Sequence, residues 1–143
     1  FTTTRSAGVV ALRNVASSGS TVLAFGDSGL IVRSTDSGAT WTDLSTTAAP
    51  SLPAGELRDG ASSNGTLWVT VGRASGNVAI ERSTDGGANW VAAASVPALG
   101  GRLNAVCYDA GTGRWTAVGT DLTFNGTLLA EGARILTSTD GNT

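Results

Sequence analysis

Short apolar runs alternate with polar clusters along almost the whole chain. Residues 21–26, 67–72 and 114–119 form three such runs, each rich in valine, threonine or aromatic residues and each ending in glycine. Clusters of serine, glycine and aspartate separate the runs, a combination that is typical of short β-strands joined by turns. No segment longer than about ten residues shows an apolar stripe at helical spacing. We therefore predict an all-β fold.

The predicted strands fall into three similar units. The first comprises residues 12–16, 21–26, 30–34 and 41–44, and the second comprises residues 57–61, 67–72, 78–82 and 90–93. The third comprises residues 103–107, 114–119 and 134–138, with no fourth strand. This pattern predicts three repeats, over residues 12–45, 57–94 and 103–143, in a single domain.

Both faces of the predicted second strands carry large apolar side chains. Aligned on their terminal glycines, these strands have one apolar set on each side, because strand side chains alternate. The two sets are Phe25, Val71 and Val118, and Val22, Trp68 and Trp115. A sheet that is apolar on both sides must lie between two others, as a blade does in a β-propeller. The sequence therefore predicts a β-propeller of four-stranded antiparallel blades, with about three blades in this chain.

A polar turn motif recurs at intervals of about 50 residues, close to the period of repeats built from small four-stranded sheets. It reads Ser-Thr-Asp-Ser-Gly-Ala-Thr-Trp at 34–41 and Ser-Thr-Asp-Gly-Gly-Ala-Asn-Trp at 83–90, and its first half returns at 138–143. The aspartate can accept hydrogen bonds from the turn, the glycine permits positive φ, and the tryptophan can cover the turn. These positions are Ser34, Asp36, Gly38, Trp41, Ser83, Asp85, Gly87, Trp90, Ser138 and Asp140. In the third copy we assign Asn142 to the glycine position, and the aromatic is absent.

This turn resembles the Asp-box, or bacterial neuraminidase repeat, whose pattern is Ser-x-Asp-x-Gly-x-x-Trp. With two full copies, one truncated copy and the strands between them, the resemblance covers nearly the whole chain. It implies a propeller of the sialidase-like superfamily, in which we expect the turn aspartates to be structural. Proteins with this repeat include sialidases and other glycoside hydrolases, sortilin-type receptors, photosystem assembly factors, lectins and phage tail or adhesion proteins, and the fold does not select among them.

Three blades cannot close a ring, since propellers use about four to eight. The outer faces of a three-blade arc would meet water, so we expect a neighbour to cover them. Two sources stay open: the remainder of a longer propeller chain, or copies of this chain arranged head to tail. In both cases we predict that residues 1–4 form an outer strand of an adjacent blade.

Charge and composition exclude several partners. Nine basic and eleven acidic residues give a net charge of −2, which produces no field that attracts nucleic acid. No run approaches the roughly 18 to 20 apolar residues that span a bilayer, so we expect no membrane insertion. The chain has no histidine and one cysteine, Cys107, so we expect no metal and no cofactor. Cys107 lies in an apolar run and is predicted to be buried.

Candidate ligand-binding residues lie at the predicted rim that carries the loops between second and third strands. In the third unit this connection expands to residues 120–133, where Asp121, Phe124 and Asn125 are candidates. The alternative is a longer hairpin that packs on a neighbouring blade. Two further candidates, Arg13 and Arg58, occupy equivalent places on the first strands, nearest the propeller axis. They can bind an anionic ligand or pair with carboxylates such as that of Asp59.

We expect a non-catalytic scaffold or binding module that recognises a glycan or a protein surface, as an adhesin, lectin or phage tail component does. We expect it to be extracellular or on a virion surface. The alternative is a fragment of a sialidase-like or other glycoside hydrolase. A sialidase-like site needs an arginine cluster and a nucleophilic tyrosine with a glutamate partner; the only tyrosine is Tyr108, and the Arg-Ile-Pro signature is absent. Glycoside hydrolysis needs two facing carboxylates, and Glu56, Glu81 and Glu131 show no spacing that indicates convergence.

Overall fold

The computed structural model describes residues 10–44, 55–96, 100–124 and 129–143. Its elements are β1 (Leu12–Ser18), β2 (Thr21–Gly26), the 3-10 turn η1 (Asp27–Gly29), β3 (Ile31–Ser34), β4 (Thr42–Asp43), β5 (Gly55–Ser62), β6 (Trp68–Ala74), β7 (Asn77–Ser83), β8 (Val91–Ala92), β9 (Gly101–Asp109), β10 (Arg114–Phe124) and β11 (Leu129–Ser138). No α-helix occurs in these ranges, which confirms the all-β prediction. Among the residues described here, no helix has the length and apolar character needed to cross a membrane.

The strands form three antiparallel sheets, and each sheet follows the order of the chain. Blade 1 contains β1 to β4, blade 2 contains β5 to β8, and blade 3 contains β9 to β11. The predicted repeats over 12–45, 57–94 and 103–143 include all of these strands except the first two residues of β5 and of β9. Residues 1–4, which we predict to be an outer strand, lie outside the described residues.

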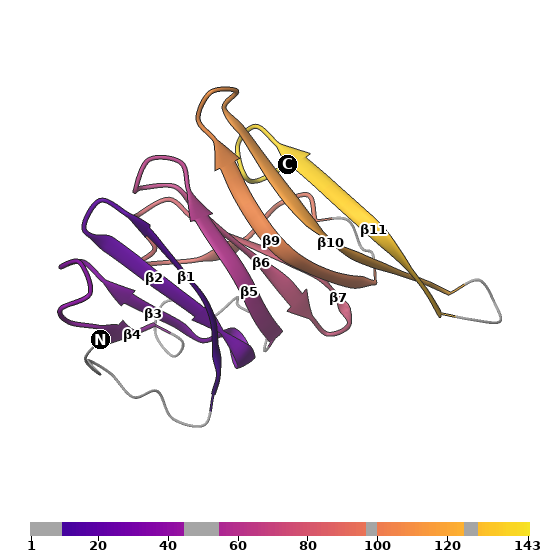
Figure 1. Ribbon diagram of the computed structural model, residues 1–143, viewed down its shortest axis with the longest axis horizontal. Coiled ribbons are helices and arrows are strands. Elements are labelled where there is room, and N and C mark those ends of the chain that lie inside the picture. Colours follow the sequence, from indigo (N-terminus) through magenta and orange to yellow (C-terminus); the bar gives the residue numbers. More distant parts are fainter. Residues whose placement is uncertain (1–9, 45–54, 97–99, 125–128) are drawn as a thin grey trace.

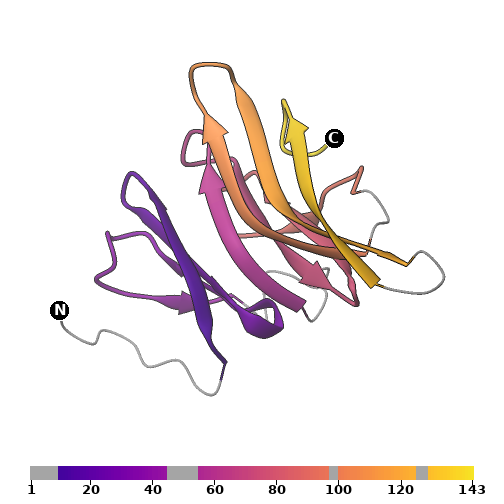
Figure 2. The same ribbon diagram turned by 45° about the vertical axis from the view of Figure 1, so that its right-hand side comes forward.

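The three sheets stack face to face and spread from a shared edge (Figures 1 and 2). The first strands β1, β5 and β9 lie next to one another at this edge, where β5 contacts both β1 and β9. The fourth strands of blades 1 and 2 lie at the opposite edge of their sheets. Consecutive blades around a propeller axis have this arrangement.

Apolar side chains fill the layers between neighbouring blades. Between blades 1 and 2 the buried side chains are Leu23, Phe25, Ile31, Leu57, Trp68 and Trp90. The rings of Phe25 and Trp90 meet edge to face, with centroids 6.0 Å apart. Between blades 2 and 3 the layer contains Val69, Val71, Val78, Leu103, Val106, Trp115 and Ala117. Blade 2 is therefore apolar on both faces, as predicted.

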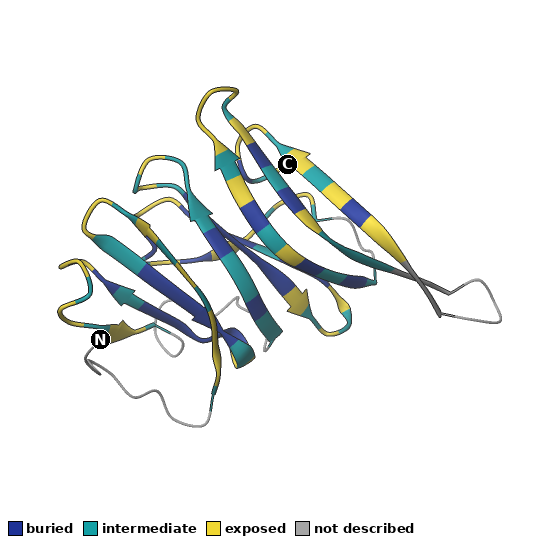
Figure 3. Ribbon diagram, in the orientation of Figure 1, coloured by how far each residue is buried: buried dark blue, intermediate teal, exposed yellow. Residues whose placement is uncertain are grey.

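The outer face of blade 3 is exposed where the equivalent faces of the other blades are buried. Strand pairing places Val118 opposite Ile135, as it places Phe25 opposite Ile31 in blade 1. Val118 is 40% and Ile135 70% exposed, whereas both blade 1 residues are fully buried. Along β11, exposed positions alternate with more buried ones (Figure 3). Cys107 lies on this same face and is exposed, so the prediction that it is buried is wrong, because no described sheet covers the face.

Each first strand has a bulge opposite an equivalent glycine. The pairing skips one residue after Leu12 and after Leu57, and the same shift occurs in β9 after Leu103. The skipped residues are Arg13, Arg58 and Asn104. The opposing glycines are Gly26, Gly72 and Gly119, and a Cβ at any of them would overlap a backbone carbonyl, that of Ala11 just before β1, of Glu56 in β5 or of Arg102 in β9. The three glycines thus permit a close backbone approach, and the bulges set the positions of the two candidate arginines.

Candidate functional site

The turn at residues 34–41 is closed by its own side chains. Asp36 accepts hydrogen bonds from Ser34 Oγ at 2.7 Å and from the Thr40 N–H at 2.8 Å. Gly38, with a φ of 92°, donates its N–H to Ser34 Oγ, and the Trp41 indole donates to the Gly38 carbonyl. Hydrogen bonds from the hydroxyl and N–H of Thr40, then from Ser34, lower the pKa of Asp36 to about 2. The Asp36 carboxylate is therefore occupied by hydrogen bonds from its own turn.

The turn at residues 83–90 repeats the same bonds. Asp85 accepts from Ser83 Oγ at 2.8 Å and from the Asn89 N–H at 2.9 Å. Gly87 has a φ of 81°, and the Trp90 indole donates to its carbonyl at 3.1 Å. The same residues that bend the chain thus also direct Trp90 toward blade 1.

The third turn differs from our alignment by one residue. Gly141, with a φ of 69°, donates its N–H to Ser138 Oγ at 2.8 Å and so takes the glycine position. The assignment of Asn142 to that position is wrong, because this turn is one residue shorter. Asp140 accepts from the N–H groups of Asn142 and Thr143, and these bonds lower the pKa of Asp140 to about 2.

Four charged side chains form a cluster, the rim cluster, where the bulged first strands meet the end of β2. Arg13 donates two hydrogen bonds to Asp27, at 2.8 and 2.6 Å, and Arg58 donates two to Glu56, at 3.1 and 2.7 Å. The hydrogen bond from Arg13 lowers the pKa of Asp27, and the charge of Arg58 contributes to the same shift. The structure thus brings both candidate arginines together, paired with Asp27 and Glu56 and not with Asp59.

A shallow polar pocket of about 360 Å³ opens beside the rim cluster. Its lining residues are Asp27, Ser28, Gly55, Glu56, Arg73, Ser75 and Gly76. Arg73 is exposed and makes no ion pair with any described residue. Sequence reasoning missed Asp27, Glu56 and Arg73, although Asp27 and Arg73 each follow the terminal glycine of a predicted strand. A pocket with charges of both signs suits a ligand rich in hydrogen-bonding groups.

Asp59 connects two blades. Its carboxylate accepts from the Val106 N–H of blade 3 at 2.8 Å and from the Gly60 N–H at 2.8 Å. Because the Val106 bond joins two first strands, it fixes blade 3 against blade 2.

Asp121, the candidate of the third unit whose side chain the structure describes, does not join the rim cluster. The expanded connection over residues 120–133 is mostly strand, because β10 continues to Phe124 and β11 begins at Leu129. The connection is therefore a longer hairpin and not a long loop, and the packing of this hairpin on a neighbouring blade lies outside the described residues. Asp121 forms an ion pair with Arg134 within this hairpin. Asn125 and the side chain of Phe124 lie outside the described part of the chain.

The carboxylates show no catalytic arrangement among the described residues. Glu56 is bound to Arg58 at the rim, while Glu81 is a buried residue of β7, 2% exposed, with no hydrogen-bond partner for Oε2. The Tyr108 ring packs against Trp115, with centroids 4.9 Å apart. Burial raises the pKa of Glu81 to about 7. Within the described ranges, no group of three or more potential metal-binding side chains occurs.

We expect Glu81→Gln to stabilise the fold at high pH. The folded-state pKa of Glu81 lies above its ordinary value of 4.5, so the folded state holds the proton more tightly than the unfolded state. This proton binding stabilises the fold fully below about pH 4.5, and the stabilisation is lost as the pH rises through about 7 and the buried carboxylate becomes charged. The variant should gain up to about 3 kcal/mol over the natural chain at pH 8 and little at pH 4. Urea unfolding at pH 4, 6 and 8 measures this gain, with Glu56→Gln as control. A gain that is the same at all three pH values would contradict the prediction.

Comparison with known proteins gives a likeness among solved structures. No protein-family model matches the chain. No curated protein sequence matches it either. Among solved structures it is similar to "YCF48 bound to D1 peptide", with a TM-score of 0.58 and 20% identity over 90% of this chain. The match covers 41% of the YCF48 chain, so this chain spans less than half of that protein. YCF48 is a β-propeller, and the likeness shows the fold: the three sheets are blades of a partial β-propeller.

Proposed function

We propose that this chain is a segment of a non-catalytic, Asp-box type β-propeller that binds an extended segment of another protein at its rim cluster. The observation that carries the proposal is the open pocket lined by Asp27, Glu56 and Arg73 and bordered by two arginine–carboxylate ion pairs. Backbone amides and charged side chains of a peptide complement such a surface. The YCF48 structure, in which a peptide is bound, supports a partner of this class.

The absence of turnover forms part of the proposal. Asp36 and Asp85 are occupied by hydrogen bonds within their turns. Glu81 is buried, and Glu56 is held by Arg58. Hydrolysis of a glycosidic bond requires an acid and a second carboxylate across the bond. These positions support a binding role over a hydrolytic one.

Removal of the Arg73 guanidinium tests the proposed site. An array of overlapping 15-residue peptides of varied charge is the first probe, with a glycan array as the second. We expect several peptides to bind in a salt-dependent manner and Arg73→Ala to weaken them at least fivefold. The matched control is Arg114→Ala, which removes an exposed arginine from β10, the second strand of blade 3. Arg114 begins its strand, whereas Arg73 lies near the end of β6, the second strand of blade 2.

Three results would contradict the proposal. Binding to glycans alone would assign the rim cluster to carbohydrate. Equal losses of peptide affinity in the Arg73 and Arg114 variants would show that the peptide does not bind in this pocket. Turnover of fluorogenic glycosides that is lost in Asp121→Asn or Glu131→Gln would make the chain part of a hydrolase.

A further inference from the structure

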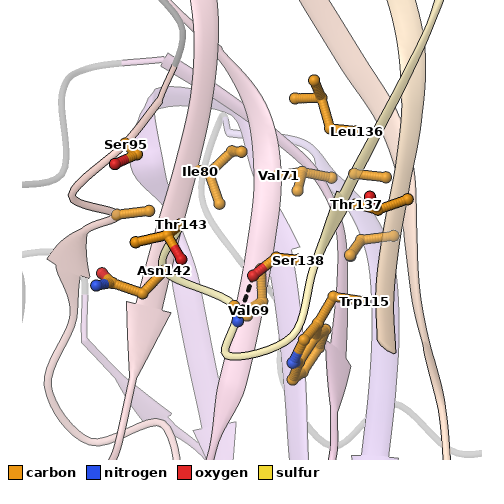
Figure 4. A pocket seen from close by; sticks show the side chains of 14 residues that line it. Val69, Val71, Ile80, Ser95, Trp115, Leu136, Thr137, Ser138, Asn142 and Thr143 are labelled. Atoms are coloured by element: carbon orange, nitrogen blue, oxygen red, sulfur yellow. Dashed lines mark hydrogen bonds between the residues drawn. The ribbon is translucent and has the colours of Figure 1, made fainter. Parts of the chain in front are cut away.

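A buried carboxyl group lies in the layer between blades 1 and 2. Glu81 of β7 pairs with Thr70 of β6. The chain neighbours Val71 and Ile80 line a pocket on the other side of the sheet, between blades 2 and 3 (Figure 4). Because strand side chains alternate, Thr70 and Glu81 lie on the face that packs against blade 1, with Trp68. Glu81 is 2% exposed and therefore belongs to the interior of this layer.

Within blade 2, nothing compensates a charge on Glu81. Its Oε2 atom is buried without a hydrogen-bond partner. The residues that pair with Glu81 in the sheet are Thr70 and Ala92, and both are uncharged. The Thr70 hydroxyl donates to the Asp59 carbonyl at 2.8 Å, while the Asp59 carboxylate points to blade 3. An ionised Glu81 would thus be a charge among apolar groups.

Arg33 is the charged side chain that β3 of blade 1 directs toward this layer. It pairs with Leu23, whose side chain packs in the layer, and it donates to the Gly86 carbonyl of the second turn at 2.9 Å. No ion pair joins Arg33 to Glu81. Asp43 of β4 lies on the outer face of blade 1. The Arg33 guanidinium therefore fastens blade 1 to a turn of blade 2 and leaves the Glu81 carboxyl unpaired.

The pocket beside the rim cluster is shared between the same two blades. Asp27 comes from blade 1, and Glu56 and Arg73 come from blade 2. The pocket residues continue strands that pass through the layer. In β2, Phe25 lies in the layer shortly before Asp27, and in β6, Thr70 lies there shortly before Arg73. A change in the separation of the two blades would therefore change the spacing of the pocket walls.

We propose that protonation of Glu81 controls the packing of blade 1 on blade 2 and, through it, the affinity of the rim pocket for its peptide. With the carboxyl neutral, the two blades pack closely. Loss of the proton puts a charge into the apolar layer, and this charge is hydrated only if water enters and the blades separate. The inference rests on the proposed function for the bound peptide, whereas the movement of the pocket walls is measurable without a ligand.

The direction of the pH effect follows from the state that holds the proton. Burial raises the pKa of Glu81 from its ordinary value of 4.5 to about 7 in the packed state. A peptide that binds the packed state therefore binds most tightly below this pH and more weakly as the pH rises through it. Because linkage is reciprocal, binding of the peptide also favours proton uptake by Glu81 near neutral pH.

The free 143-residue chain, labelled with ¹⁵N, gives the first test. We expect the amide resonances of Ser28 and Gly76, in the two pocket walls, and the Trp90 indole N–H to titrate together between pH 5.5 and 8.5. This range lies above the ordinary pKa of surface carboxyl groups, about 4. These resonances should stay constant in Glu81→Gln. They should titrate as in the natural chain in Asp109→Asn, which removes an exposed carboxyl group from blade 3.

Two results of this titration would overturn the proposal. The first is that the pocket amides of the natural chain stay constant while the spectrum shows a folded chain. The second is that they titrate equally in Glu81→Gln, which retains every other titratable group of the chain. A titration of the Trp90 indole alone would likewise separate the layer from the pocket and overturn the coupling.

The second test measures peptide affinity by fluorescence anisotropy, with the 15-residue array peptide that binds most tightly at pH 6. In the natural chain we expect affinity to be at least about threefold weaker at pH 8.5, and in Glu81→Gln we expect no weakening. A pH dependence that persists in Glu81→Gln would overturn the coupling. Pocket amides that titrate in a chain that binds no array peptide would support the movement of the blades and contradict the proposed ligand, so the two failures are distinguishable.

Discussion

Replacement of Trp90 by alanine is expected to lower the free energy of unfolding by about 4 kcal/mol. The indole is 2% exposed, meets Phe25 edge to face and fills the layer between blades 1 and 2. Its removal leaves a cavity in that layer, and a cavity adds to the lost transfer free energy because the two sheets cannot fully close over it. Urea unfolding followed by circular dichroism measures the loss.

Trp41→Ala is the matched control, because Trp41 has the same place in the first turn. Its ring is half-buried and packs on the outer face of blade 1, against Ala24, Leu30 and Val32. We expect it to cost roughly half as much as the change at Trp90. Equal losses would show that the layer between the blades contributes no more than the turn itself, contrary to this account.

The second large effect is expected at Gly72. A Cβ at this position would overlap the carbonyl of Glu56 on the bulged first strand. Since both groups belong to paired backbone, the strands must separate, and we expect Gly72→Ala to cost about 3 kcal/mol or more. Thermal unfolding gives the loss, and the rim cluster should lose peptide binding as well, because the bulge positions Arg58.

Gly132→Ala is the control for this change. Gly132 also lies in a strand, but a Cβ there would meet its nearest neighbour, Asp121 Cβ, at 3.9 Å, an ordinary contact. We expect a change within about 0.5 kcal/mol. A loss of stability at Gly132 as large as that at Gly72 would mean that any glycine in these strands is costly to replace. The overlap with the bulged strand would then not explain the effect at Gly72.

The all-β fold and the three repeats could be predicted because both leave local marks in the sequence. Strand periodicity, terminal glycines and turn residues are properties of a few neighbouring positions. The arrangement of the sheets followed from large side chains on both faces of one strand, such as Trp68 and Val71. The exposed state of Cys107 could not be predicted this way, because burial depends on whether another sheet covers its face.

Two predictions for the third repeat were wrong: Asn142 at the glycine position of the turn, and a long loop over residues 120–133. Both errors arise because the number of residues between two aligned positions does not determine the local structure between them. A turn shortened by one residue keeps its hydrogen bonds when the glycine also moves by one place, which the hydrogen bonds of Gly141 reveal. Likewise, residues 120–124 and 129–133 pair one to one, so additional length became strand. Spacing alone does not distinguish a longer loop from a longer ladder.

The rim cluster shows the limit for the candidate site. Equivalent positions on the first strands singled out Arg13 and Arg58, which the structure places in the rim cluster, but not their partners Asp27 and Glu56. Asp27 is fourteen residues from Arg13 in the chain, and it reaches the arginine only because the bulge and the end of β2 meet. Ion pairs across strand ends depend on register, which the sequence specifies only through the whole sheet.

The two ends of the three-blade arc are chemically unlike. Blade 1 covers part of its outer face with its own Trp41, whereas blade 3 leaves Val118 and Ile135 open to solvent. Within the arc, the face of blade 2 that carries Trp90 packs on the opposite kind of face of blade 1, so a blade added in the same way would join unlike faces. Back-to-back pairing of two identical ends would bury like against like and leave both complementary surfaces unused.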